Sequence, residues 1–217
     1  MKKILLFILL VSIPVECFAS KYNTEIMANA SKYLGVRENT NRNDHPEIDR
    51  WLLDVGLDNK ALTSKGKQGY SYCAAFVHSM LKQSYAMRGE KSKHLRSARV
   101  VDNWKNAKKD KFTYTVTPAK HVLIGAYKLH PADVIIWSNK KTDDNWNGHT
   151  GFVVRQVSDS KFKAIEGNTG ASNKASEQRE QYGVSTKLEQ NGGVRLKDRS
   201  IDPYSSFLCE GFIRIND

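Results

Sequence analysis

The hydrophobic pattern of this chain changes once, from helical spacing in the first half to short strand-like segments in the second. Helical periodicity predicts helices over 26–34, 44–55, 72–87 and 97–108. Segments that alternate in polarity or are rich in β-branched residues follow at 134–137, 148–157, 162–168, 194–199 and 207–215. Helices first and strands afterwards predict an α+β fold with an antiparallel sheet, because a parallel array needs a crossover between successive strands.

The second predicted helix has a recognisable start. Asp44 and Glu47 have the spacing of a capping box, with Pro46 in the first turn. No internal repeat or Pro/Ser-rich linker interrupts the pattern, so we expect one domain. Its helical lead-in covers 20–65 and its core covers 66–217.

Residues 1–19 have the parts of a secretory signal peptide. A charged start is followed by an apolar run at 4–11, and Cys17 and Ala19 are small residues at the positions that signal peptidase inspects. The run is far shorter than the ~20 residues that cross a bilayer. We therefore expect cleavage after Ala19 and a secreted or periplasmic protein. A lipid-attached Cys17 is the weaker alternative.

The chain is basic, with 34 Lys and Arg against 23 Asp and Glu, a formal net charge of +11. Such a surface suits polyanions, including nucleic acid, anionic membranes and cell-wall polymers. Export, and the lack of a basic stripe with interleaved aromatic residues, argue against nucleic acid. No second long apolar run follows the signal, so no transmembrane segment is expected.

Cys73 lies where a loop containing glycine and serine meets the third predicted helix. The first turn of a helix carries unpaired N–H groups and the positive end of the helix dipole, and both favour a thiolate. The small Ala74 and Ala75 would let the helix pack closely while the sulfur faces a groove. A buried structural cysteine, or a disulfide with Cys209, is the alternative.

Of the six histidines, His149 has the surroundings that suit a general base. It opens a predicted strand between Gly148 and Gly151, which are expected to clear space around the ring. His78 lies on the helix of Cys73 but about 140° around its axis, so it cannot easily face the sulfur. The others stand among charged or loop residues and are expected at the surface: His45, His94, His121 and His130.

The next predicted strand ends with Glu166, Gly167 and Asn168. Period-two alternation projects Glu166 and Asn168 from one face, which would lie beside His149 if the two strands pair antiparallel. Either side chain could accept from the imidazole and fix its tautomer, as in other nucleophile–base–orienter systems. An ordinary polar strand end at a turn is the alternative.

Cys209 is expected in the core, on the strand face of Phe207, Ile213 and Ile215. The sequence has no Cys-x-x-Cys and no closely spaced pair of histidines. We therefore expect no metal and no other cofactor.

These motifs resemble, in order and spacing, those of a known family. Four segments are similar to segments of the CHAP family of cysteine, histidine-dependent amidohydrolases and peptidases. They are Tyr-Cys-Ala-Ala-Phe-Val, Pro-Ala-Asp-Val-Ile-Ile-Trp, Gly-His-Thr-Gly-Phe-Val-Val and Ile-Glu-Gly-Asn-Thr. The resemblance runs from about 69 to 215, and 193–199 resembles a strand common in secreted bacterial members. It implies a papain-like α+β fold and cleavage of amide bonds in peptidoglycan. Position by position, it implies four roles: Cys73 as nucleophile, His149 as base, Glu166 as orienter and Asn168 as a supporting polar residue.

Three further residues are candidates for substrate binding. Gly148 lies beside the proposed base, and Tyr72 lines the groove or packs below it. Gln68 lies upstream of the nucleophile, where papain-like enzymes place an oxyanion donor, although its spacing is not a close match.

Two features depart from the family pattern. The acidic calcium-binding segment of some members is replaced at 65–68 by Lys-Gly-Lys-Gln, which again predicts no metal. The polar stretch 170–193 is longer than expected and is interpreted as a loop or insertion at the rim of the groove.

The leading hypothesis is an exported peptidoglycan hydrolase, either an N-acetylmuramoyl-L-alanine amidase or a peptide endopeptidase. A cysteine peptidase or acyltransferase acting on proteins is one alternative, and an inactive wall-binding module is another. Bacterial peptidoglycan is the expected partner, and an inhibitor or immunity protein is a further candidate.

Overall fold

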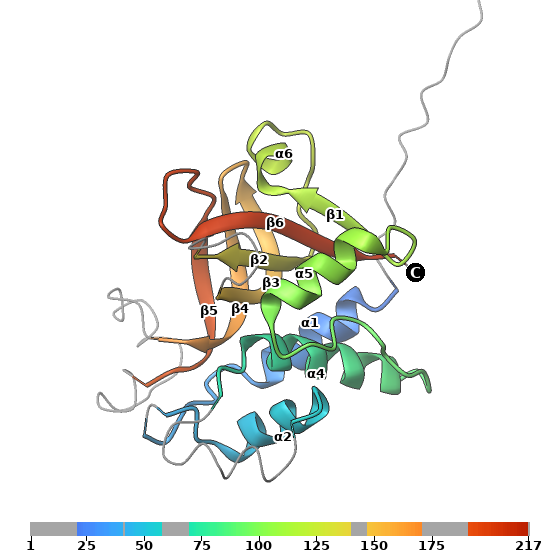
Figure 1. Cartoon of the computed structure of the whole chain (residues 1–217), viewed down its shortest axis with the longest axis vertical. Helices are drawn as coiled ribbons and strands as arrows, with labels where there is room; N and C mark the ends of the chain where they lie inside the picture. The colour runs from blue at the N-terminus through green and yellow to red at the C-terminus, as the bar shows by residue number, and fades with distance from the viewer. Residues whose placement is uncertain (1–20, 41, 58–69, 140–146, 171–190, 217) are drawn as a thin grey trace, which may run out of the picture.

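The computed structural model describes residues 21–40, 42–57, 70–139, 147–170 and 191–216 (Figure 1). The signal segment 1–19, Gln68 and residues 171–190 of the polar stretch lie outside the described residues. Within the described ranges, no helix combines the length and the apolar character needed to cross a membrane.

Each predicted helix and strand has a counterpart in the structure. The helices are α1 (Asn23–Lys32), α2 (Pro46–Asp54), α4 (Cys73–Ala86), α5 (Val100–Lys109) and α6 (Ala119–Leu123). The strands are β1 (Tyr114–Pro118), β2 (Val134–Ser138), β3 (Gly148–Ser158), β4 (Lys161–Thr169), β5 (Gly193–Ser200) and β6 (Leu208–Ile215). The α+β class is confirmed, whereas β1 and α6 were not predicted.

The strands form one antiparallel sheet in the order β1-β6-β2-β3-β4-β5. β3 and β4 pair antiparallel, with Phe152 opposite Ile165, which meets the condition under which Glu166 would lie beside His149. Because β5 adds to the far side of β4, three strands that are consecutive in the sequence lie side by side. Side chains from these strands can therefore meet at one end of the sheet.

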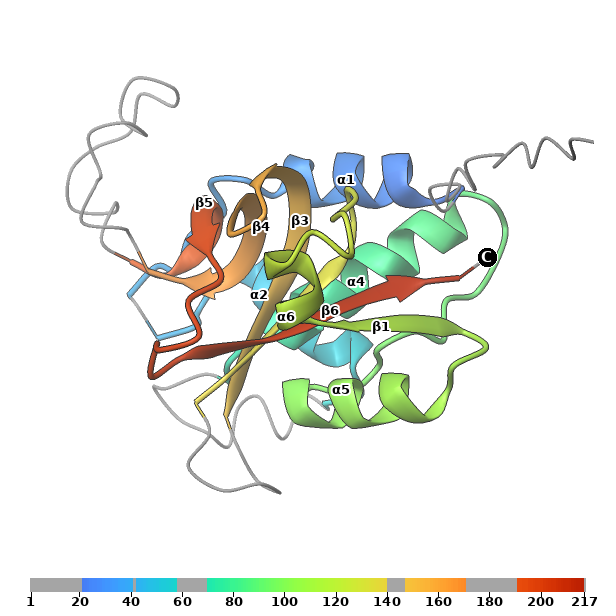
Figure 2. The same ribbon diagram turned by 90° about the horizontal axis from the view of Figure 1, so that it is seen from above.

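Helix α4 lies against β3 and β4, and α1 and α2 pack against α4 (Figure 1). This position explains why almost every side chain of α4 is buried rather than one stripe of it. Phe76 joins the two layers, because its ring contacts Trp51 of α2 at 5.1 Å and Phe152 of β3 at 6.4 Å between centroids. The opposite face of the sheet has a second hydrophobic cluster around Phe162 and Phe212. Figure 2 shows α5 running alongside β1, with which it is in contact.

The predicted cap of α2 was wrong. The N-cap is His45 rather than Asp44, and its Nδ1 accepts the backbone N–H of Glu47 at 3.1 Å. Asp44 instead accepts the backbone N–H of Thr40 at 2.9 Å and closes the preceding loop.

The predicted alternation of β6 was also wrong. The register between β2 and β6 shifts just after Ile136, next to Gly211. An added Cβ at Gly211 would lie 2.2 Å from the carbonyl oxygen of Thr117, so a close approach of strands requires glycine here. As a result Cys209 packs with the second cluster, while Ile213 belongs to the cluster under the helices.

We predict that Trp51→Ala destabilises the whole domain by about 3–5 kcal/mol, since Trp51 is fully buried and contacts α4. Leu53→Ala on the same helix is the control, because Leu53 is 41% exposed. Its cost should stay below about 1 kcal/mol. Urea unfolding followed by circular dichroism measures both variants. Equal stabilities, or a separate unfolding step for the lead-in, would contradict this packing.

Candidate active site

Cys73 is the first residue of α4 and is only 4% exposed. The first N–H groups of a helix have no acceptor within the helix, so the sulfur lies at the positive end of α4. Ala74 and Ala75 behind it are completely buried, which lets the helix pack closely on its neighbours. The thiol is free, and its interaction with the imidazole of His149 helps to raise the pKa of that ring.

His149 is the second residue of β3, opposite Trp137 of β2. Its Nε2 is 2.9 Å from Oε2 of Glu166. Nδ1 is therefore the ring nitrogen left to face Cys73. The imidazole also contacts the rings of Trp137 and Phe207, at 5.8 and 6.5 Å between centroids. Together these contacts hold the ring in one orientation.

Glu166 accepts hydrogen bonds from two cationic groups. Its side chain is completely buried on β4. Nε of Arg199 donates to Oε1 at 2.7 Å, and Nη2 of Arg199 donates to Oε2, the oxygen that also faces His149. Burial alone would raise the pKa of Glu166, but these bonds and charges lower it to about 2. The group is therefore a carboxylate throughout the neutral range.

His149 is held in its protonated form. Burial alone would lower the pKa of His149, but its interactions with Cys73 and with the Glu166 carboxylate raise it to about 9. Interactions of the imidazolium stabilise the folded protein fully when the pH is below 6.5, the ordinary pKa of histidine. That stabilisation is lost as the pH rises through about 9, the pKa in the folded protein. Near neutral pH the arrangement favours a proton on the ring beside the sulfur.

Gly151 makes room for Glu166 rather than for the imidazole. An added Cβ at Gly151 would lie 2.6 Å from Cγ of Glu166 and 2.6 Å from the carbonyl oxygen of Ile165. The expectation that this glycine clears space around His149 was therefore wrong in its detail. The missing side chain lets β4 approach, so that Glu166 reaches His149 two residues along β3.

Asn168 does not share the environment of Glu166. Its φ of 57° lies in the left-handed region, and the register of β4 with β5 shifts between Glu166 and Thr169. The simple alternation expected here is therefore interrupted. Glu166 takes the bond to the imidazole, whereas the backbone of Asn168 lies near the side chain of Tyr72 and lowers the pKa of its hydroxyl.

Tyr72 lies below the site, the second of the two positions considered for it. It is completely buried, and its hydroxyl donates to Oε1 of Glu38 at 3.3 Å. Burial and the neighbouring Glu38 raise the pKa of Tyr72. Gly148 is the first residue of β3 and precedes His149 directly.

Arg199 is a residue of the candidate site that sequence reasoning missed. It lies on β5, pairs with Glu166 and places its guanidinium 5.2 Å from the ring centroid of Trp137. A signal was present, since Arg195, Lys197 and Arg199 alternate along the predicted strand. Such spacing places three cations on one strand face beside the strand of Glu166.

Neither described cysteine forms a disulfide, so the Cys73–Cys209 pairing considered from the sequence is absent. Cys209 is half-buried, and burial raises the pKa of its thiol to about 12. Among the described residues, no group of three or more His, Cys, Asp or Glu side chains could hold a metal ion.

We predict that Arg199→Met destabilises the protein by about 3 kcal/mol at pH 7, because it removes a partner of a buried carboxylate. The effect should shrink below pH 4.5, where protonation of Glu166 in the variant removes the uncompensated charge. Lys163→Met is the matched control, since Lys163 pairs with Asp198 at the surface and should cost less than about 1 kcal/mol. Unfolding free energies at several pH values test this, and a pH-independent loss would contradict it.

Comparison with known proteins adds one match. No curated protein and no solved structure matches the chain. Residues 65–168 match the CHAP domain. The matched segment includes α4, β2, β3 and β4, and hence Cys73, His149 and Glu166, whereas Arg199 lies beyond it. This segment of the chain is therefore a CHAP domain, the domain of a family of cysteine- and histidine-dependent amidohydrolases and peptidases.

Proposed function

We propose that this protein is an exported cysteine hydrolase that cleaves amide bonds in bacterial peptidoglycan. The observation that carries the proposal is the series of hydrogen bonds from His149 through Glu166 to Arg199, together with the interaction of Cys73 with the imidazole that helps to raise its pKa. A CHAP domain indicates hydrolysis of peptidoglycan in general terms. A nucleophile on a helix followed by a base on a strand is also the order found in papain-like enzymes, which supports that part of the fold prediction.

In the first step, the Cys73 thiolate attacks the amide carbonyl and forms a carbon–sulfur bond. The backbone N–H groups at the start of α4 are placed to stabilise the resulting oxyanion. The imidazolium of His149 then gives its proton to the departing amine as the carbon–nitrogen bond breaks. The products of this step are a thioester on Cys73 and a free amine.

In the second step, neutral His149 takes a proton from water, and the hydroxide attacks the thioester carbonyl. The carbon–sulfur bond breaks, which releases the acid product and regenerates the thiolate beside the imidazolium. Glu166 stays ionised throughout and orients the imidazole through Nε2, while Arg199 keeps Glu166 in place.

The basic character of the chain supports an anionic wall polymer as substrate. The scissile bond is either the sugar–peptide amide or a peptide bond of the stem or cross-bridge. The pattern of residues 1–19 supports export. Asn168 remains a proposed supporting residue, through its contact with Tyr72 below the nucleophile.

We predict that Cys73→Ala and His149→Ala each lower peptidoglycan hydrolysis at least about 10³-fold, because nucleophile and base act as one unit. Mass spectrometry of digested peptidoglycan measures the new amine termini, and fragment masses identify the bond. Cys209→Ala is the matched control and should retain turnover, since Cys209 packs in the second cluster, outside the hydrogen-bonded series.

Retained hydrolysis in Cys73→Ala would overturn the mechanism. Cleavage of proteins by the wild type, without products from any wall preparation, would select a cysteine peptidase instead. Wall binding that survives Cys73→Ala, with no hydrolysis by the wild type, would indicate a binding module.

We predict that hydrolysis by the wild type falls as the pH rises through about 9, because His149 then loses the proton needed by the leaving amine. Glu166→Gln should move this fall to lower pH, since the carboxylate raises the pKa of His149. Asp198→Asn, which removes an exposed carboxylate beside Arg199 in the chain, is the control. Profiles of kcat/KM against pH decide the matter. Superimposable curves for wild type and Glu166→Gln would remove Glu166 from its positioning role.

A further inference from the structure

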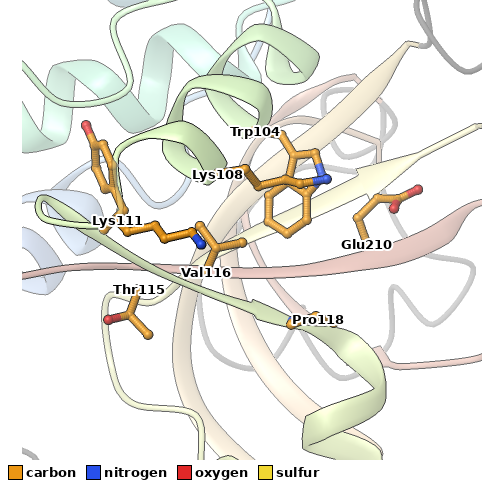
Figure 3. A pocket seen from close by; sticks show the side chains of 8 residues that line it. Trp104, Lys108, Lys111, Thr115, Val116, Pro118 and Glu210 are labelled. Atoms are coloured by element: carbon orange, nitrogen blue, oxygen red, sulfur yellow. The ribbon is translucent and has the colours of Figure 1, made fainter.

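A pocket lies between α5 and β1, apart from the hydrogen-bonded series of the candidate active site. Its volume is about 590 Å³, within the range of pockets that hold small ligands. Trp104, Tyr114 and Val116 provide an apolar floor, and the first two are more than nine-tenths buried. Figure 3 shows how these side chains and the charged residues around them are arranged.

Both signs of charge line this pocket. Lys108 and Lys111 are the basic residues of its lining, and Glu210 of β6 is the acidic one. In Figure 3, Lys111 and Glu210 lie on opposite sides of the Trp104 ring. Nζ of Lys108 is 5.6 Å from the centroid of that ring. A ligand that matches this layout carries a carboxylate at one end, an amine at the other and an apolar segment between them.

Glu210 also connects the pocket to the catalytic end of the sheet. Ser138, the last residue of β2, donates its hydroxyl hydrogen to Oε1 of Glu210. Ser138 pairs across the sheet with Gly148, the residue directly before His149. A ligand in the pocket would therefore have its amine end toward the catalytic residues.

We propose that this pocket is a substrate-binding subsite for the peptide part of the wall polymer, an assignment of ligand that rests on the proposed function. Wall peptides carry free carboxylates and, where they contain a diamino acid, a side-chain amine. The carboxylates bind at Lys108 and Lys111, the amine binds at Glu210, and the aliphatic part lies over Trp104.

The strand beside the pocket also favours a peptide over a glycan. β1 is an edge strand, with no strand partner on its outer side among the residues described. Edge strands are the surfaces to which extended peptides add. A neutral sugar offers no charge to the lysine pair or to the carboxylate, so charge complementarity points the same way.

Calorimetric titration of Cys73→Ala protein with a soluble, sugar-free stem tetrapeptide that contains a diamino acid tests the subsite. On this background, joint Lys108→Ala and Lys111→Ala should weaken binding at least about tenfold, the loss expected for a charge-assisted contact. Lys109→Ala is the matched control, because Lys109 is the exposed neighbour of Lys108 on α5 and is not part of the pocket lining. It should change the affinity less than about twofold.

The amine end has its own test. Glu210→Gln should weaken binding of the tetrapeptide at least about fivefold, because a charged partner of the amine is lost. Acetylation of the side-chain amine should remove the difference between this variant and its parent. Thermal melting of each variant checks that it remains folded.

Several results would overturn the subsite. These are no binding of the tetrapeptide, equal affinities for the lysine double variant and Lys109→Ala, or binding of a neutral N-acetylglucosamine disaccharide in place of the peptide. The proposed function is tested separately by wall digestion with the wild type. If the wild type digests the wall but the lysine double variant binds the peptide with unchanged affinity, the subsite is wrong and the proposed function stands. If the peptide binds through the lysines but the wild type does not digest the wall, the proposed hydrolase activity is wrong and the peptide-binding site stands.

Discussion

A carboxylate without access to water lies at the centre of this protein, and the neighbouring strands are arranged around its charge. A buried charge is costly unless partners with good geometry compensate it, so Glu166 needs cationic donors on both sides. Arg199 supplies two donors from β5, and His149 supplies one from β3. The strand of Glu166 must therefore lie between those two, as it does in the sheet order. Gly151 on β3 allows β4 to come close enough for these bonds, because a side chain at this position would keep the two strands apart.

Most of the fold and the order of the proposed catalytic residues could be predicted, because periodicity and turn residues act locally. The missed strand β1 is short and depends on pairing with β6, from the other end of the core. The sequence could not predict which face of the sheet Cys209 lies on. A register shift between β2 and β6 reverses that face, and the pattern of residues along β6 does not reveal the shift. Arg199 was missed for a related reason: its role depends on which strand lies beside β4, and that is a property of the sheet.

The lead-in segment also reaches the candidate site through the connection between α1 and α2, although none of its residues takes part in the proposed chemistry. Glu38 follows α1 in the chain and accepts from the hydroxyl of Tyr72, the residue before the nucleophile. The backbone of Asn168, just after the orienting carboxylate, meets the same tyrosine. Three segments that are distant in the sequence thus converge under the start of α4. The position of the sulfur depends on this buried polar cluster as well as on the helix itself.

The place of Arg199 on β5 has a consequence for how the protein reaches its working state. A chain that has emerged only as far as β4 already contains Cys73, His149 and Glu166, but it lacks the cation that makes burial of the carboxylate favourable. Contacts between distant segments form late, because loop closure must precede them. The charge network of the site should therefore assemble only once β5 has docked. A chain that ends before β5 would therefore lack the organised charge network of the candidate site, although it already contains the other three residues.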